Sequence, residues 1–282
     1  MTIHQASAHL KARAEPEAPT TLRMMPCRDG PMLYFPHDFY LGGAMEKYGE
    51  YGKIEFDMLA RYVKAGDAVI EVGANMGCHT VPLAKLVGGS GFLVVFEPQR
   101  IIYQMLCGNL ALNGLWNVIA EHAGVGDRLG VIYVPQVDYA RPGNFGAVSL
   151  STQESPEATP LVTIDEYCAA IKRCDLIKID VEGMELDVLK GAAGIIGKFR
   201  PVLYVENDRS DKSEALCKFI REDLRYELYW HTPRLFNPEN FRGDPVNIYG
   251  DVVSINMLCF PMESGVIPDG LQKVGTESGQ LQ

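Results

Sequence analysis

The sequence lacks any apolar run of about 18 residues, so it predicts no transmembrane helix. Its first 20 residues carry polar and charged groups without an apolar core, unlike a secretory signal. Positive charge is scarce as well, because 26 Lys and Arg stand against 36 Asp and Glu, a net charge of −10. Such a surface repels a phosphate backbone, and no basic stripe with interleaved aromatic residues is present. We therefore expect a cytoplasmic protein with a small-molecule partner and no nucleic acid.

Paired metal-binding or disulfide motifs are also missing. None of the seven cysteines forms a C-x-x-C pair, and their odd number and irregular spacing indicate free thiols in a reducing compartment. The six histidines lack H-x-x-x-H spacing, so a zinc site is not expected. What is present is a chain of 282 residues, 47% of them apolar, which suffices for one large domain or two small ones.

The most informative stretch covers residues 69–77 and reads Val-Ile-Glu-Val-Gly-Ala-Asn-Met-Gly. An apolar run with the acidic residue Glu71 near its end is followed by Gly73 and Gly77, and then by a helix-like segment. This pattern predicts a strand, a tight turn and the start of a helix. Such a turn brings backbone N–H groups and a helix N-terminus against a ligand.

A second apolar segment, 92–96, ends in Glu97-Pro98, where a carboxylate suits hydrogen bonding to a ribose diol. A dinucleotide fingerprint, G-x-G-x-x-G, has a middle glycine that lets the backbone touch a pyrophosphate, but Asn75 stands at that position here. The nearby Glu71 would repel a pyrophosphate and could anchor an ammonium group. The two acids therefore favour S-adenosylmethionine (SAM), which carries an ammonium and a sulfonium, over NAD.

Strand-like and helix-like segments alternate along the chain. We expect strands at 68–72, 92–96, 118–121, 176–179 and 202–205, helices at 77–87, 101–112, 186–189 and 211–221, and later strands near 227–230 and 252–259. A short β-segment at 130–135 and a long loop at 139–160 interrupt the alternation. This order predicts an α/β fold with a mainly parallel central sheet and helices on both faces.

The domain organisation follows from composition. Residues 1–25 are expected to be a disordered tail, 26–65 a cap or lid with a helix, 66–262 the main domain, and 263–282 a C-terminal tail. The cap is rich in aromatic residues and glycine, which is compatible with either a packed cover or a mobile lid.

Acidic residues follow the carboxyl ends of four expected strands, namely Glu71, Glu97, Asp180 and Glu206. Ligands of parallel sheets bind beyond these ends. Asp180, Glu182 and Glu206 are the catalytic candidates, because a hydroxyl acceptor needs a base and neighbouring carboxylates raise one another's pKa. Asp180, Glu206 and Asn207 could also offer oxygen ligands to Mg²⁺, but contacts to substrate and loops are favoured, so no metal site is predicted.

Two further positions are less specific. Asp127 follows the third strand, where an acid can accept from an adenine amino group, although Gly-Asp is also an ordinary turn. Lys178 lies inside an apolar strand and receives no role.

Several motifs together resemble the FkbM-type family of SAM-dependent methyltransferases over residues 32–262. The central ones are Glu71-Val-Gly-Ala-Asn75-x-Gly77-x-x-Thr80, Phe96-Glu97-Pro98, Gly126-Asp127, Gly146-x-x-Ser149-Leu150 and Lys178-Ile-Asp180-Val-Glu182-Gly-x-Glu185. Asp38, Tyr48-Gly-Glu-Tyr51, Asn109-x-x-x-Asn113, Asn117-Val118 and Ser254-Ile-Asn256 also fit. The chain departs from the family pattern at Glu71, where aspartate is usual, and at Gln99, where a second proline often follows.

The resemblance implies a class I Rossmann-like methyltransferase fold and O-methylation of a hydroxyl on a small or glycosylated metabolite, such as a sugar, lipid or polyketide. The positions that it places in contact with SAM are Glu71, Gly73, Ala74, Asn75, Gly77, Thr80, Glu97, Pro98, Asp127 and Ser149. It places Asp180 and Glu182 near the acceptor.

Three alternatives stay open. An N-methyltransferase is disfavoured because no Asn/Asp-Pro-Pro-Tyr motif is present. An NAD-dependent oxidoreductase is opposed by the missing middle glycine. A non-catalytic SAM-binding protein would share the glycine turn but would transfer no methyl group.

Overall fold

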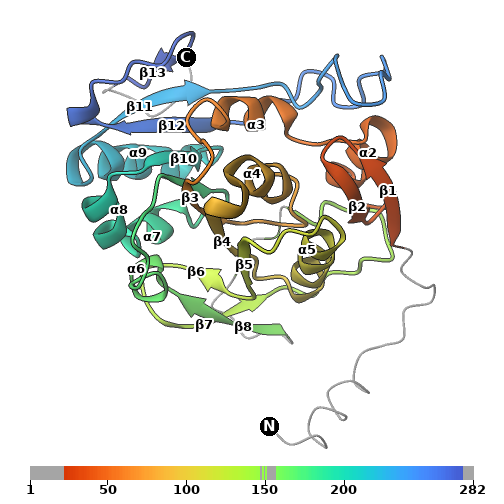
Figure 1. Cartoon of the computed structure of the whole chain (residues 1–282), viewed down its shortest axis with the longest axis horizontal. Coiled ribbons are helices and arrows are strands. Elements are labelled where there is room, and N and C mark those ends of the chain that lie inside the picture. The colour runs from red at the N-terminus through yellow and green to blue at the C-terminus, as the bar shows by residue number, and fades with distance from the viewer. Residues whose placement is uncertain (1–21, 147, 149, 151–156, 276–282) are drawn as a thin grey trace, which may run out of the picture.

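A computed structural model describes residues 22–146, 148, 150 and 157–275, and a central eight-stranded sheet organises them (Figure 1). The strand order is β13-β11-β12-β10-β9-β3-β4-β5. Five neighbouring strands run parallel: β10 (Val202–Glu206), β9 (Leu176–Ile179), β3 (Ala68–Val72), β4 (Phe92–Phe96) and β5 (Val118–Glu121). The α/β prediction of a mainly parallel sheet is confirmed.

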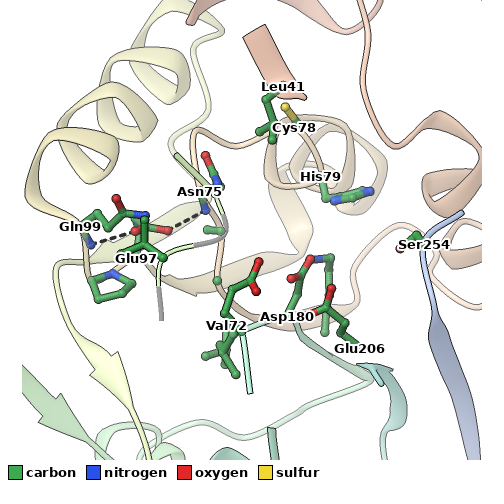
Figure 2. Close-up of a pocket in the computed structure, with 18 of the residues that line it drawn as sticks. Leu41, Val72, Asn75, Cys78, His79, Glu97, Gln99, Asp180, Glu206 and Ser254 are labelled. Carbon is green, nitrogen blue, oxygen red and sulfur yellow. Dashed lines mark hydrogen bonds and ion pairs between the residues drawn. The ribbon is translucent and has the colours of Figure 1, made fainter. Parts of the chain in front are cut away.

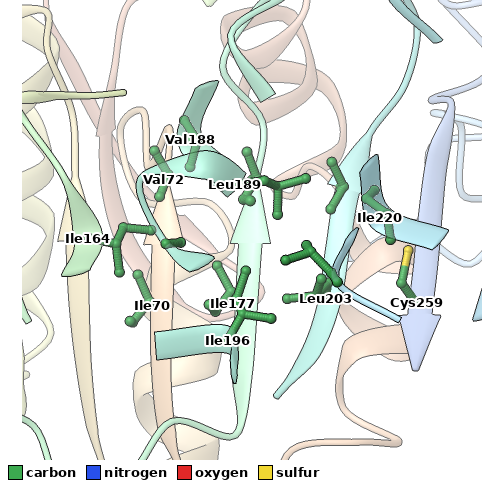
Figure 3. Packing of buried hydrophobic residues seen from close by; sticks show 14 of the residues in the cluster. Ile70, Val72, Ile164, Ile177, Val188, Leu189, Ile196, Leu203, Ile220 and Cys259 are labelled. Carbon is green, nitrogen blue, oxygen red and sulfur yellow. The ribbon is translucent and has the colours of Figure 1, made fainter. Parts of the chain in front are cut away.

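Helices cover both faces of this sheet, because the parallel strands carry apolar side chains on each side. One face packs against α3 (Lys53–Leu59), α4 (Thr80–Val87) and α5 (Arg100–Leu112). The other packs against α6 (Ile164–Tyr167), α7 (Glu185–Lys190), α8 (Ala193–Phe199), α9 (Ser210–Lys218) and a π-helical turn at Phe219–Asp223. Figure 3 shows this second core, with Ile70, Ile177 and Leu203 from three adjacent strands in contact with the helices.

Helix α5, the longest among the described residues, shows why these segments are helical. Its buried side chains, Ile102, Met105, Leu106, Asn109 and Leu110, recur at the spacing of one helix face. Asn109 is polar and fully buried, and its side chain bonds the backbone of Leu33 and Met76. The helix therefore ties the N-terminal hairpin to the glycine turn. No helix in the described part of the chain has the length and apolarity needed to cross a bilayer.

The N-terminal part is more regular than expected. A hairpin forms from β1 (Arg23–Cys27) and β2 (Gly30–Tyr34), and α2 (Leu41–Tyr48) follows it. Strand β1 therefore begins within the segment predicted to be a disordered tail, whose residues 1–21 lie outside the described part of the chain. Pro26 and Pro31 obscure the pattern of this hairpin in the sequence, since proline usually argues against a strand.

The C-terminal part extends the sheet with antiparallel strands. Strands β11 (Tyr226–His231) and β12 (Asn256–Pro261) pair with each other, and β12 also pairs with β10. The short strand β13 (Gln272–Lys273) joins β11 at the edge, so part of the expected C-terminal tail belongs to the sheet. Residues 276–282 lie outside the described part of the chain.

A separate three-stranded sheet consists of β6 (Gly124–Val125), β8 (Glu157–Val162) and β7 (Gly130–Val134). Strand β8 begins inside the segment that we predicted to be a loop up to residue 160. It alternates buried Thr159 and Leu161 with exposed neighbours, which is the period of a strand, but Pro160 hides that pattern.

The strand order changes direction between β3 and β9. The chain runs outward from β3 through β4 to β5 and then returns to build β9 and β10 on the other side of β3. A backbone bond from Asp180 N–H to Val72 O, 3.0 Å long, holds the ends of β9 and β3 together. Ligands of open α/β sheets bind at such a switch point, beyond the carboxyl ends of the strands.

The core prediction concerns Ile177, which is fully buried in the middle of the sheet. Replacing it with alanine should lower the free energy of unfolding by about 2–5 kcal/mol, because the cavity cannot close completely. Ile119→Ala, at a side chain 53% exposed on the edge strand β5, should change it by less than about 0.5 kcal/mol. Urea denaturation of both variants measures the difference, and equal losses would contradict the assigned core.

Candidate active site

A cavity of about 350 Å³ opens at the switch point. Predicted site residues that line it are Gly73, Ala74, Asn75, Glu97, Pro98, Asp180, Glu182 and Glu206. Figure 2 shows Glu97 on one side of it beside Asn75 and Gln99, and Asp180 next to Glu206 on another. The acids at the carboxyl ends of β4, β9 and β10 therefore meet in one cavity, as their position in the sequence predicted.

The glycine turn forms the cavity wall between β3 and α4. Gly73 has a φ of +83°, and a Cβ built on it would lie 1.8 Å from the Asp180 carbonyl oxygen, so only glycine fits. Asn75 follows in the left-handed region with a φ of 49°, which asparagine tolerates. The absence of a side chain at Gly73 thus allows the residue that follows β9 to pack directly against the turn.

Glu97 is bound to this turn from the neighbouring strand. One carboxylate oxygen accepts from Asn75 N–H at 2.9 Å and the other from Gln99 N–H at 2.8 Å. Burial raises the pKa of Glu97 to about 7, although these two backbone donors oppose the rise. A carboxylate oxygen can accept more than one hydrogen bond, so Glu97 keeps acceptor capacity toward the cavity.

Glu71 and Thr80 lie beneath the turn instead of facing the cavity. Thr80 Oγ1 donates to Glu71 Oε2 at 2.7 Å, and Lys178 Nζ lies 3.8 Å from Glu71 Oε1. The side chain of Glu71 points to the α4 face because Ile70 and Val72 point to the opposite one. The predicted contact of Glu71 and Thr80 with a cofactor stays a prediction. In the structure both side chains lie under the glycine turn and are hydrogen-bonded to each other.

Three other predicted contacts also lie away from the cavity lining or outside the described residues. A Cβ at Gly77 would lie 2.9 Å from Leu106 Cδ1, so this glycine permits close packing on α5. Asp127 is exposed and pairs with Arg128 at 3.1 Å. Ser149 is outside the described residues. In place of Asp127, the residues of this part of the chain that line the cavity are Ala123, Gly124 and Val125.

Lys178 is the main feature that the sequence did not explain. Its side chain is 2% exposed, and its Nζ lies 3.1 Å from Asp180 Oδ2, while the register pairs Lys178 with Glu71 across the strands. Burial alone would lower the pKa of Lys178, but Asp180, Glu71 and Glu55 outweigh burial and raise it. The ammonium group therefore stays charged and holds Asp180 at the cavity.

A second acidic group lies at the ends of β9 and β10. Glu182 forms an ion pair with Arg209, while Glu206 Oε2 is buried with no hydrogen-bond partner among the described residues. Burial, followed by the charges of Asp180 and Asp208, raises the pKa of Glu206 to about 11. Glu206 therefore holds its proton at neutral pH, and in this state it is a hydrogen-bond donor.

Oxygen atoms of Glu182, Glu206 and Asp208 lie within 4.8 Å of one another, but Glu182 is already paired with Arg209. This group differs from the Mg²⁺ ligands considered from the sequence, which are Asp180, Glu206 and Asn207. Asn207 is buried, and its side-chain nitrogen lies 3.3 Å from Met257 Sδ and 3.5 Å from Cys217 Sγ. The geometry adds no argument for a metal at Asp180, Glu206 and Asn207.

A further wall of the cavity comes from the N-terminal and C-terminal parts of the chain, where only Tyr51 and Ser254 belong to motifs of the resemblance. Tyr40, Leu41, Tyr51 and Glu55 line it from the N-terminal side, and Leu235, Val252, Val253 and Ser254 from the loop between β11 and β12. The Tyr40 and Tyr249 rings stack at 6.1 Å, and Tyr249 Oη donates to Tyr40 O at 2.7 Å. Figure 1 shows this loop reaching α2 from the far end of the sheet.

The switch-point cavity, the glycine turn and the acid after β4 define a class I, Rossmann-like methyltransferase fold. The sequence profile described as methyltransferase FkbM domain matches residues 71–229, and the chain belongs to this family. The prediction from the motifs is therefore confirmed.

Relatives and solved structures give the following similarities. The chain is 29% identical over 158 residues to "Methyltransferase sdnD" of Sordaria araneosa, covering 44% of this chain and 59% of that protein. It is 25% identical over 147 residues to "Methyltransferase 1" of Beauveria bassiana (strain ARSEF 2860), covering 44% and 57%. It thus spans less than two thirds of either relative. A crystal structure of methyltransferase FkbM from Methylobacillus flagellatus KT superimposes with a TM-score of 0.48 at 16% identity, over 70% of this chain and 44% of that one.

The buried ammonium group of Lys178 yields a stability prediction. Lys178→Met should cost about 3–5 kcal/mol of unfolding free energy, because it leaves Glu71 buried without a counter-charge. The double variant Lys178→Met/Glu71→Gln should recover part of that loss, since the remaining amide can still accept from Thr80. Lys190→Met, at a side chain 45% exposed, is the matched control. Urea denaturation tests this, and no recovery in the double variant would refute the pairing.

Proposed function

We propose that this chain is a SAM-dependent O-methyltransferase that acts on a hydroxyl of a small or glycosylated metabolite with a sugar-, lipid- or polyketide-like body. The observation that carries the proposal is the buried carboxylate of Glu97, which is bound to the glycine turn at the edge of the switch-point cavity. Family membership supports methyl transfer as the chemistry.

The residues present fit the cofactor. The cavity is lined by the acids Glu55, Glu97, Asp180, Glu182, Glu206 and Asp208 and by two cationic side chains, Lys178 and Arg209. A cationic sulfonium nucleoside is attracted by such a lining, and a pyrophosphate is not. When bound, SAM supplies an electrophilic methyl group. Glu97 would accept hydrogen bonds from the ribose hydroxyls, and the backbone of Gly73 and Ala74 would approach the amino-acid portion.

The acceptor would occupy the other half of the cavity, between Asp180 and the wall formed by Tyr40, Tyr51, Leu235 and Val252. Asp180 is held by Lys178, so its second oxygen can orient an acceptor hydroxyl without moving. The aromatic and aliphatic side chains favour a molecule with an apolar body, and the acidic lining disfavours an anionic one. Much of the rate enhancement would come from positioning the oxygen against the methyl carbon and from excluding water.

The first test concerns the cofactor. Glu97→Ala should abolish measurable SAM binding in titration calorimetry, because the ribose loses its acceptor and the turn loses the bond to Asn75 N–H. Glu214→Ala, at an exposed position on α9, should bind as the wild type does. Near-normal SAM affinity in Glu97→Ala would refute the ribose role. Titration with NAD in the same instrument distinguishes the oxidoreductase alternative.

The second test concerns the acceptor side. Asp180→Asn should lower turnover by about 10-fold or more while SAM affinity changes little, because Asp180 would orient the acceptor and not the cofactor. Turnover is measured with methyl-labelled SAM and uncharged acceptors, namely methyl glycosides, glycerol monoesters and hydroxylated macrolactones. Equal loss of turnover and SAM affinity would assign Asp180 to the cofactor. Transfer to amines only would support the N-methyltransferase alternative, and SAM binding without transfer to any acceptor would support a non-catalytic protein.

A further inference from the structure

Glu55 is a buried acid on the acceptor side of the cavity that no motif predicted. It belongs to α3, its residue is 5% exposed, and it lines the cavity together with His79 and Ser254. These three residues come from α3, from the start of α4 and from the segment before β12, so the fold alone brings them together. Figure 2 shows His79 and Ser254 on the same side of the cavity, away from Glu97.

The contacts of Glu55 leave its carboxylate without a direct cationic partner among the described residues. The Ser254 side chain is hydrogen-bonded to it, and His79 Nε2 lies 3.6 Å from Glu55 Oε2. His79 Nε2 also lies 3.3 Å from the carbonyl oxygen of Gly52, which can only accept, so this nitrogen carries the hydrogen. Burial and Lys178 lower the pKa of His79 to about 3, and the imidazole is neutral at physiological pH.

The other acids of the cavity are already engaged. Asp180 faces Lys178, Glu182 and Asp208 are paired with Arg209, and Glu97 accepts from two backbone N–H groups. Glu206 holds its own proton at neutral pH. Glu55 is therefore the acid best able to take a proton from a molecule bound on the acceptor side.

We propose that Glu55 accepts the proton of the acceptor hydroxyl during methyl transfer, so that α3 carries the catalytic base. This inference rests on the proposed function. The acceptor oxygen forms a bond to the methyl carbon while the bond between that carbon and sulfur breaks, its electron pair staying on sulfur. The O–H electron pair stays on oxygen, and the proton moves to the Glu55 carboxylate. One positive and one negative charge disappear together, which an enclosed cavity favours.

The groups around Glu55 agree with this role. Lys178, Asp180, His79, Tyr51 and Tyr204 face it from the neighbouring elements. Burial raises the pKa of Glu55 to about 7, against the opposing effect of Lys178, while Asp180 adds to the rise. Burial also raises the pKa of both tyrosines well above its usual value, so neither titrates near neutrality. A base with a pKa near the working pH is both available and strong enough to assist the transfer.

The decisive variant is Glu55→Gln, which keeps the shape and the hydrogen bond to Ser254 but cannot take up a proton. Turnover should fall by about 10²-fold or more, with SAM affinity by calorimetry within about twofold of the wild type. At saturating SAM, where the titration of Glu97 no longer limits cofactor binding, the acidic limb near pH 7 in the pH profile of kcat/KM for the acceptor should disappear. The control is Asp57→Asn, on the same helix at an exposed side chain paired with Lys53, which should keep both rate and profile.

A second readout does not depend on activity. Infrared spectra of the protein without SAM should show a protonated carboxyl band that is lost as the pH rises through about 7. Because Glu97 titrates in the same range, its band overlaps that of Glu55. The contribution of Glu55 is the difference between the spectra of the wild type and of Glu55→Gln. A Glu55→Gln enzyme that keeps its rate and its pH profile, or an unchanged infrared titration, would overturn the proposal. Equal loss of SAM affinity would also overturn it.

The failure of the proposed function looks different. If the wild-type chain neither bound SAM nor transferred methyl to a glycoside, monoester or macrolactone, the methyltransferase assignment would fail. The infrared titration of Glu55 would still be measurable in that case, so the two failures are distinguishable.

Discussion

The site depends on one buried charge, the ammonium group of Lys178 in the middle of a parallel sheet. A lone ammonium there would be costly, and Glu71 on β3 and Asp180 just after β9 pair with it, while Glu55 on α3 adds a negative charge from further away. The same pairing fixes Asp180 at the end of β9 and keeps Glu71 under the glycine turn. The ion pairs that stabilise the buried ammonium group of Lys178 thus also fix where Glu71 and Asp180 lie.

Much of the architecture could be predicted from the sequence because apolar runs, acidic strand ends and a glycine turn are local signals. The parallel strands begin and end within a residue of the expected bounds. Strands β1, β2 and β8 escaped prediction because each contains a proline within its pattern. The position of Glu97 beside the turn also followed from its place after β4.

The part of the cavity around Glu55 could not be predicted in the same way. Glu55, His79 and Ser254 are far apart in the sequence, and only Ser254 is a defined position of a motif. Glu71 is a different case, because the period of two along β3 already indicated that its side chain leaves the sheet opposite to Ile70 and Val72. The place of a residue at the end of a strand puts its backbone near the cavity. The direction of its side chain then decides whether the residue lines the cavity.

The loop between β11 and β12 is bound to α2 through Tyr48, Tyr249 and Val246, so both ends of the chain form one wall. This wall lies outside residues 71–229, the part that the family profile matches. The cavity lining is therefore encoded partly by residues 71–229 and partly by the two stretches that flank them. Mutations in the flanks can reshape their part of the lining while the glycine turn and Glu97 are preserved, but the two flanks must change together, because each packs against the other.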